Sequence, residues 1–436
     1  MKRLAVSLCI VSIAMMPIAG CDSGTSSIEL SERTVSVAEF RTYAQKVGTV
    51  FADTSWDQLG QVAIEEISIP AFSGGDSIWG ALGCDDRGHI WFGVSGNSAR
   101  LFEWIPDSKT MLDHGDVNAA LKTAGLLRQG ERQGKIHSHI QQADDGYLYF
   151  TSMDETSESW RTDTPPKWGS HLWRVRPETG RWEHVLSAPE GLIALHAMGR
   201  WVYALGYWNH VMYQYDTVSK HVRSRVVGSS CGHVSRNFIV DLRGHAYVPR
   251  IEPRDGGANQ DCLAQELQAS LVEFDTRLEE VAATPLEGYL MAKPSGNHGI
   301  ISYSFLADGT AMFVTHGGQL YHLIPAGRGP AMLLPQTQLH PDENAYTASL
   351  FSVDGERFLA GVGNSKAGMQ WIRYDRRSGK SSASALDLPA HKALLMYGSM
   401  ARDLQGDFYV GGRIQDHFGY MRPILFRLSL QGGEEG

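Results

Sequence analysis

The chain has 436 residues, of which 42% are hydrophobic and 20% charged, with 47 glycines and 11 tryptophans. This length and composition exclude a disordered or coiled-coil protein and are typical of a glycine- and aromatic-rich all-β fold with a sizeable core. The net charge of −9 argues against a nucleic-acid binder, which needs a basic surface. An acidic polysaccharide stays open as a partner, provided that basic residues cluster locally.

The first residues form a targeting segment. Lys2 and Arg3 precede the apolar run LAVSLCIVSIAMMPIAG, which is too short for a good membrane span. The run ends in IAGC, which resembles the lipobox of bacterial lipoproteins and implies cleavage before Cys21 and a diacylglycerol on its thiol. A plain secretory peptide and a buried core helix are the alternatives. We expect a signal peptide over residues 1–20, and a tether and N-terminal segment over 21–50.

A polar turn with glycine recurs along residues 51–436, followed each time by a short run of alternating aromatic and aliphatic residues, as in DDRGHIWFG and DDGYLYF. The marker glycines are Gly88, Gly146, Gly199, Gly244, Gly309, Gly355 and Gly406. Seven such units, roughly 50 residues apart, predict an all-β, seven-bladed β-propeller, with six or eight blades as the alternative. A sandwich gives no reason for seven equivalent hairpins, and solenoid repeats are shorter.

Segments outside the repeat have their own expectations. VAIEEISIP (62–70) is a candidate strand to complete the last blade and close the ring. The insertion around residues 113–133 predicts a short helix that is capped by Asp116 and ends near Gly125. Residues 33–50 are expected to form a helix outside the ring. We predict no second domain.

Polar residues gather at the beginnings of blade strands, which line the central channel of a propeller, and in the stretches WGSHLWRV and LGYWNHVMYQY between them. They are His137, His139, His171, Tyr207, His210, His233, Arg236, Asn237 and His298. Each has an ordinary structural explanation when taken alone; Arg236, for example, could pair with Asp241 or Asp403. Taken together, on neighbouring blades and facing one mouth, they predict an acid–base site.

The chemistry that this set suits is β-elimination on a uronic acid. A cation or amide must neutralise the carboxylate before the C5 proton becomes acidic enough to remove. A base then takes that proton, and an acid protonates the oxygen that leaves C4. Two carboxylic acids flanking a bond, as in glycoside hydrolysis, are not evident at comparable positions.

Four motifs, GKIHSHI…DGYLYFTSMDE, WGSHLWRV, YALGYWNHVMYQY and GHVSRNFIVD…HAYVPR, resemble the seven-bladed ulvan lyases of marine bacteria over about residues 75–255. The resemblance implies a site of two histidines, a tyrosine and an arginine. The histidines would be His137 or His139, together with His171. The tyrosine would be Tyr207, with Tyr213 as the alternative, and Arg236 would neutralise the carboxylate. The expected substrate-binding residues are Asn237, His210, His298 and Arg250.

The cysteines allow two interpretations. With Cys9 removed and Cys21 lipidated, Cys84, Cys231 and Cys262 remain, an odd number that permits one disulfide and a free thiol. Cys231 and His233 form a C-x-H pair that, with Cys262 and one further histidine, could hold a structural zinc, as the resemblance also implies. The spacing is not diagnostic, and buried free thiols remain the better expectation. We expect no cofactor to be required for catalysis.

The sequence thus predicts an exported, monomeric polysaccharide lyase, anchored by lipid at Cys21 to the bacterial cell envelope, in the periplasm or at the cell surface. Its expected partner is an acidic polysaccharide containing uronic acid, similar to ulvan. The alternatives are a related propeller glycoside hydrolase, which hydrolyses without forming a double bond, and a non-catalytic glycan-binding propeller.

Overall fold

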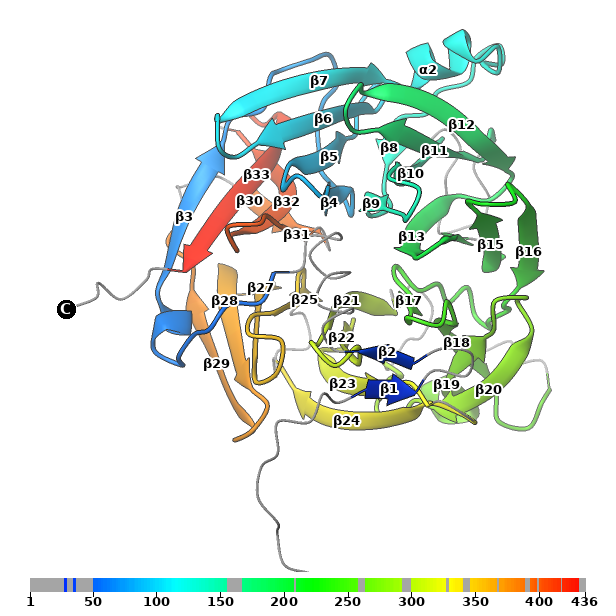
Figure 1. Cartoon of the computed structure of the whole chain (residues 1–436), viewed down its shortest axis with the longest axis vertical. Helices are drawn as coiled ribbons and strands as arrows, with labels where there is room; N and C mark the ends of the chain where they lie inside the picture. Colours follow the sequence, from blue (N-terminus) through cyan, green and yellow to red (C-terminus); the bar gives the residue numbers. More distant parts are fainter. Residues whose placement is uncertain are drawn as a thin grey trace, which may run out of the picture.

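The protein is a ring of seven antiparallel β-sheets around a central channel, as seen in a computed structural model of the chain (Figure 1). The structure describes residues 27–29, 34–36 and 50–430, apart from 155–166, 208, 258–262, 292–298, 327–328, 340–345, 367, 389–392, 398–399 and 417. Within that part of the chain, no helix has the length and apolar character needed to cross a membrane. The predicted all-β, seven-bladed propeller is confirmed.

Each sheet is one blade, and the blades follow one another in chain order from the innermost strand outward. Blade 1 has β4 (Leu82–Cys84), β5 (Ile90–Val94), β6 (Arg100–Ile105) and β7 (Thr110–Asp116). Blade 2 has β8 (Lys135–Ile136), β9 (Gln141–Gln142), β10 (Leu148–Met153), β11 (Ser170–Arg176) and β12 (Arg181–Ala188). Blade 3 has β13 (Leu192–Met198), β14 (Trp201–Gly206), β15 (Val211–Asp216) and β16 (Val222–Val226).

The other four blades repeat the plan. Blade 4 has β17 (Ile239–Val240), β18 (Ala246–Pro253), β19 (Leu267–Phe274) and β20 (Glu280–Pro285), with the 3-10 turn η2 (Ala264–Glu266) before β19. Blade 5 has β21 (Ile300–Phe305), β22 (Ala311–Thr315), β23 (Gln319–Ile324) and β24 (Met332–Gln338). Blade 6 has β25 (Tyr346–Thr347), β26 (Phe351–Ser352), β27 (Phe358–Ser365), β28 (Gly368–Asp375) and β29 (Lys380–Ala385). Blade 7 has β30 (Ala393–Met396), β31 (Ala401–Arg402), β32 (Phe408–Gln415) and β33 (Met421–Leu430).

An N-terminal strand closes the ring. β3 (Val62–Ile67) follows the 3-10 turn η1 (Gln58–Gly60) and pairs antiparallel with β33, so it becomes the outermost strand of blade 7. Figure 1 shows this early strand, in blue, beside the red C-terminal strand. The prediction for residues 62–70 is confirmed over β3, and the pairing covers the outer edge of β33.

The seven marker glycines all have left-handed backbone, with φ between 61° and 92°. Each lies in the turn from the innermost strand of its blade to the second strand. A residue with a Cβ is strained in that conformation, so glycine recurs at this point of every blade. The repeat in the sequence is therefore a repeat of turn geometry, which is why it predicted the number of blades.

Blades 1 and 4 carry the same polar network beside this turn. Asp241 and Glu273 both hold Arg243, at 2.7 and 2.8 Å, and Glu273 also contacts His245 at 2.7 Å. Asp85, Arg87, His89 and Glu103 repeat the arrangement in blade 1. Asp85, His89 and Glu103 lie close enough together to hold a metal ion. The Arg87 guanidinium already bonds both carboxylates, so we assign this set to structure.

The segments around the ring agree with the sequence only in part. Helix α2 (Val117–Thr123) is capped as predicted, because the Asp116 side chain accepts a hydrogen bond from the Ala119 amide, and Gly125 follows with φ of 70°. The predicted helix over residues 33–50 is wrong at its start, where β2 (Thr34–Ser36) pairs with β1 (Ser27–Glu29). Most of that segment, and Cys21, lie outside the described residues.

Candidate functional site

The site lies at the channel mouth where the innermost strands begin, opposite the glycine turns. Trp79, His137, Tyr346 and Tyr397 stand nine residues before Gly88, Gly146, Gly355 and Gly406, respectively. Because the turns repeat in register, each of these four blades offers the corresponding side chain to the same mouth. In blades 2, 6 and 7 the innermost strand is also interrupted, between β8 and β9, between β25 and β26, and between β30 and β31.

A small cavity opens at this mouth. It is lined by Gly80, His137, His139, Ile193, Arg236, Asn237, Ile301, Tyr346 and Tyr397. The structure therefore brings together His137, His139, Arg236 and Asn237, as the sequence predicted. It also adds two tyrosines that the sequence analysis missed.

Three cations, Arg236, Arg413 and Lys135, lie at or beside the mouth, together with one acid, Asp76, whose charge acts on Tyr397. The buried Nε of Arg236 and that of Arg413 have no hydrogen-bond partner among the described residues. Arg413 lies over the rings of Trp79 and Tyr397, 5.5 Å from each centroid, and the Lys135 ammonium lies 4.5 Å from the Trp79 ring centroid. A guanidinium with an unused N–H group at a cavity wall is suited to bind a carboxylate.

The His137 ring is oriented by the backbone of the next blade. Its Nδ1 lies 3.1 Å from the Ile193 carbonyl oxygen, which can only accept a hydrogen bond, so Nδ1 carries the proton and the neutral ring keeps its lone pair on Nε2. Burial, with the charges of Arg236 and Lys135, holds the pKa of His137 well below its ordinary value of 6.5. His137 is therefore neutral near pH 7 and has the protonation state of a general base.

The two tyrosines are kept protonated. Burial raises the pKa of both Tyr346 and Tyr397 although Arg236 lowers each, and Tyr346 also hydrogen-bonds Arg236. The Tyr397 hydroxyl is buried without a hydrogen-bond partner among the described residues, and its ring lies 4.4 Å from that of Trp79. A phenol in this state can donate a proton to a leaving oxygen.

His139 points deeper into the channel than His137 does. Its ring stacks on Tyr303 at 5.9 Å, and Tyr303 stacks on His196 at 5.2 Å. His139 also lines a second, larger cavity, which extends toward the glycine turns between Met198 and Arg402. The paired histidines thus have separate surroundings, and His137 is the one beside Arg236.

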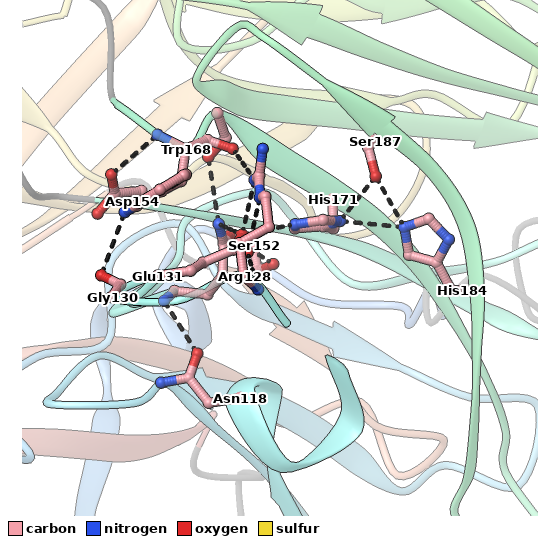
Figure 2. A network of polar contacts seen from close by, with 12 residues as sticks. Asn118, Arg128, Gly130, Glu131, Ser152, Asp154, Trp168, His171, His184 and Ser187 are labelled. Atoms are coloured by element: carbon pink, nitrogen blue, oxygen red, sulfur yellow. Dashed lines mark hydrogen bonds and ion pairs between the residues drawn. The ribbon is translucent and has the colours of Figure 1, made fainter. Parts of the chain in front are cut away.

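Two residues assigned to catalysis from the sequence lie elsewhere. His171 is on β11, the third strand of blade 2, where it contacts Glu131 and His184 in a network away from the mouth (Figure 2). Tyr207 packs against Met153, Ile193 and Val234 and does not line the mouth cavity. The alternative Tyr213 is also on a third strand, in β15. The carry-over of His171 and Tyr207 to the site is therefore corrected, because the strand order separates them from the innermost strands.

The expected substrate-binding residues mostly serve the fold. The Asn237 amide donates to the carbonyl oxygen of Ile301 at 2.6 Å and ties blade 4 to blade 5. Arg250 forms a double hydrogen bond with Glu280, at 2.9 and 3.0 Å, so its charge is already matched. His210 is buried away from the mouth cavity, with Nδ1 on the Gly228 carbonyl oxygen. His298 lies outside the described residues.

The predicted zinc ligands do not form a zinc site as the chain is arranged here. Cys231 is disulfide-bonded and has no thiolate to offer, and its partner lies outside the described residues, as does Cys262. Both ring nitrogens of His233 are occupied, Nδ1 by the Ser229 hydroxyl at 2.8 Å and Nε2 by the Tyr289 hydroxyl at 2.6 Å. Cys84 is a free, buried thiol. We correct the zinc prediction on these contacts.

Of the mouth residues that the sequence analysis missed, three could have been found from the sequence and one could not. Trp79, Tyr346 and Tyr397 share the nine-residue offset with His137, so aligning the blades on their turn glycines would have found them. Arg413 comes from β32, the second strand of blade 7. No repeated position marks it, because the second strands differ in length and in the loops that follow.

Comparison with known proteins shows the fold class of this molecule but does not show its family. No family model and no curated protein matches the chain. Among solved structures, the extracellular domain of a one-component system of B. thetaiotaomicron is similar with a TM-score of 0.52 at 14% identity, over 83% of this chain and 39% of that one. The chain thus spans well under half of that protein. The WD40 repeats of RRP9 are similar with a TM-score of 0.50 at 9% identity, over 84% of this chain and 97% of theirs. At these identities the likeness shows the β-propeller fold alone.

Proposed function

We propose that this protein is a lyase that cleaves a uronic-acid-containing polysaccharide, similar to ulvan, by β-elimination at the channel mouth. The observation that carries the proposal is the shared cavity of Arg236, His137, Tyr346 and Tyr397. It combines a cation with an unused N–H group, a neutral imidazole and protonated phenols. These are the groups that elimination next to a carboxylate requires.

Substrate binding begins with the carboxylate. The uronate would dock on Arg236, whose buried Nε is available and whose charge is not matched by a described acid. Neutralising the carboxylate increases the acidity of the C5 proton, and a charge fixed in advance at a dry wall stabilises the developing negative charge strongly. The Tyr346 hydroxyl, bonded to Arg236, would hold the guanidinium in place.

The elimination then needs one base and one acid. Nε2 of His137 would take the C5 proton, and the electron pair of the C5–H bond would form the C4–C5 double bond. The C4–O bond breaks, and the Tyr397 hydroxyl would protonate the departing oxygen. The products are an unsaturated uronate at one new chain end and an alcohol at the other. His137 then carries one extra proton and Tyr397 lacks one, so loss of a proton from His137 to water and gain of a proton from water by Tyr397 reset the site.

The surroundings of the cavity suit an acidic sugar chain. Although the whole chain carries a net charge of −9, Lys135, Arg236 and Arg413 place three cations at this mouth. Trp79, half-buried among them, offers an aromatic face to a sugar ring. This is the local basic cluster that an acidic polysaccharide needs.

The deciding experiment is incubation of the purified protein with ulvan while ultraviolet absorbance and reducing ends are followed together. We expect both to rise, because elimination creates a conjugated double bond as well as a new chain end. Reducing ends without absorbance would show a glycoside hydrolase, and binding without either would show a glycan-binding propeller. Either result would overturn the proposal. Inactive His137→Gln, which keeps a polar group of similar size, excludes a contaminating lyase.

We also propose export and lipid anchoring at Cys21, on the resemblance of IAGC to a lipobox. The similarity to an extracellular domain agrees with export, but at 14% identity it shows the fold alone. Expression of the full chain in a bacterium with labelled palmitate should give a labelled envelope protein. Cys21→Ser should abolish the label, and equal labelling of both proteins would contradict the proposal.

A further inference from the structure

A second polar cluster lies on the outer strands of blade 2, where a β-bulge redirects one histidine. His171 pairs with Ser187 across β11 and β12, and the register then shifts so that Trp173 pairs with His184 instead of Val185. The bulge places His184 on the same face of the sheet as Ser187 and His171. Bulges commonly re-aim a side chain in this way at functional positions. Figure 2 shows the three side chains converging.

The proton positions in this cluster follow from Glu131. Its Oε1 lies 3.0 Å from Nε2 of His171, 2.9 Å from Arg128 and 3.1 Å from the Gln133 amide. The Arg128 guanidinium donates to both oxygens of Glu131, as it does to a carboxylate. Because the carboxylate only accepts, Nε2 of His171 must donate to it. In the neutral ring the lone pair is therefore on Nδ1.

Two groups lie close to the lone pair on Nδ1 of His171. Nε2 of His184 lies 3.0 Å from Nδ1 of His171, and the Ser187 hydroxyl lies 3.1 Å from the same nitrogen and 3.3 Å from His184. One imidazole lone pair accepts one good hydrogen bond, yet two groups approach it. Three electron-rich atoms within 3.3 Å of one another are the arrangement that a cation would satisfy.

We propose that Nδ1 of His171, Nε2 of His184 and Oγ of Ser187 bind a divalent transition-metal ion. Ligands about 2.1 Å from a tetrahedral metal lie roughly 3.4 Å apart, close to the separations seen here. Two imidazoles with a hydroxyl favour Zn²⁺ or Cu²⁺ over Ca²⁺ and Mg²⁺, which prefer carboxylates and carbonyls. The site takes no part in the proposed elimination.

The residues behind the proposed ligands are arranged as they are in metal centres. Glu131 holds the far nitrogen of His171, which is how carboxylates orient ligating histidines. Arg128 fixes Glu131 and also donates to the Trp168 carbonyl oxygen at 2.5 Å. Ser187 is exposed and His184 half-buried, so an ion could enter from solvent and keep one position for water. Metal binding would thus also brace the chain from residue 128 to 131 against Trp168.

The test is calorimetric titration of the full, untagged protein with ZnCl₂ at pH 7.5 after chelator treatment and dialysis. We expect one zinc to bind with micromolar or tighter affinity. His184→Ala should weaken this binding at least about 10-fold, since even losses behind the ligands cost that much. His221→Ala removes an exposed histidine of blade 3 and should leave binding unchanged. Zinc should also raise the melting temperature of the wild type but not of His184→Ala.

Two results would overturn the site. One is the absence of zinc binding by the wild type, which would make the cluster a hydrogen-bond chain only. The other is equal zinc binding by the wild type and His184→Ala, which would place the ion elsewhere. Because His184 is half-buried, His184→Gln and the melting temperature without metal separate lost ligation from lost folding. As a second readout, the Cu²⁺ spectrum should show two coordinated nitrogens in the wild type and one in His184→Gln.

Discussion

The two faces of this propeller use similar side chains for opposite purposes. Beside the glycine turn of blade 4, Arg243 is buried between Asp241 and Glu273, and His245 bonds the same glutamate. At the opposite mouth, Arg236 lies near His137 but keeps an unpartnered Nε and no described acid bonds it. Residue type is thus a poor guide to function here. The difference is that the charge of Arg243 is paired with acidic side chains, whereas no described acid bonds Arg236.

The largest expected effect is on the acid. Tyr397→Phe removes only the hydroxyl that has no hydrogen-bond partner among the described residues, so folding should be unaffected. Turnover of ulvan should fall by roughly 10²–10⁴-fold, the usual contribution of a general acid. Steady-state absorbance assays give the loss, and the melting temperature reports folding.

The matched control for that change is Tyr207→Phe. Tyr207 packs against Met153, Ile193 and Val234 and does not line the cavity, so activity should stay near that of the wild type. If Tyr207→Phe loses activity while Tyr397→Phe keeps it, the original assignment from the sequence is right and the acid proposed here is wrong.

The next effect tests Arg236, the cation that no described acid bonds. Arg236→Ala should reduce turnover by roughly 10²–10³-fold, as for the loss of one preorganised charge-stabilising group. Its stability should fall only modestly, because Tyr346 loses a hydrogen bond but no described acid loses a partner. A variant that folds normally and still eliminates at the wild-type rate would remove Arg236 from the mechanism.

The sequence could predict the fold better than the site, for a physical reason. Glycine is favoured wherever a turn residue has left-handed backbone, so Gly88 and its six equivalents mark the blades in the sequence. A site residue is chosen by its place in space, and His171 and Tyr207 look suitable in the sequence although their strand or loop lies outside the mouth. The sequence could place His137 and Arg236 together at the mouth because His137 directly follows the innermost strand β8 and Arg236 comes shortly before the innermost strand β17. Arg413 enters from a second strand, which only the folded ring brings to the mouth.

Arg243, whose charge is paired with two acids, should by contrast be needed for stability. Arg243→Ala leaves Asp241 and Glu273 buried without their partner, which costs about 3 kcal/mol of folding free energy, as for other broken buried ion pairs. Arg87→Ala in blade 1 should cost less, because that side chain is 35% exposed and water can replace it. Urea unfolding measures both losses. Equal stabilities of Arg243→Ala and the wild type would break the contrast between the two faces.

The smallest effect concerns the base. Lys135 is one of the charges that lower the pKa of His137, after burial and Arg236. Lys135→Gln removes that charge, so the pKa of His137 should rise and the ring should become protonated at a higher pH. The acidic limb of kcat/KM against pH, which reports the free enzyme, should therefore move upward. Lys122→Gln, on exposed helix α2, should leave the profile unchanged. An identical acidic limb in Lys135→Gln and the wild type would show that another group is the base, and that His137 is neutral for no catalytic purpose.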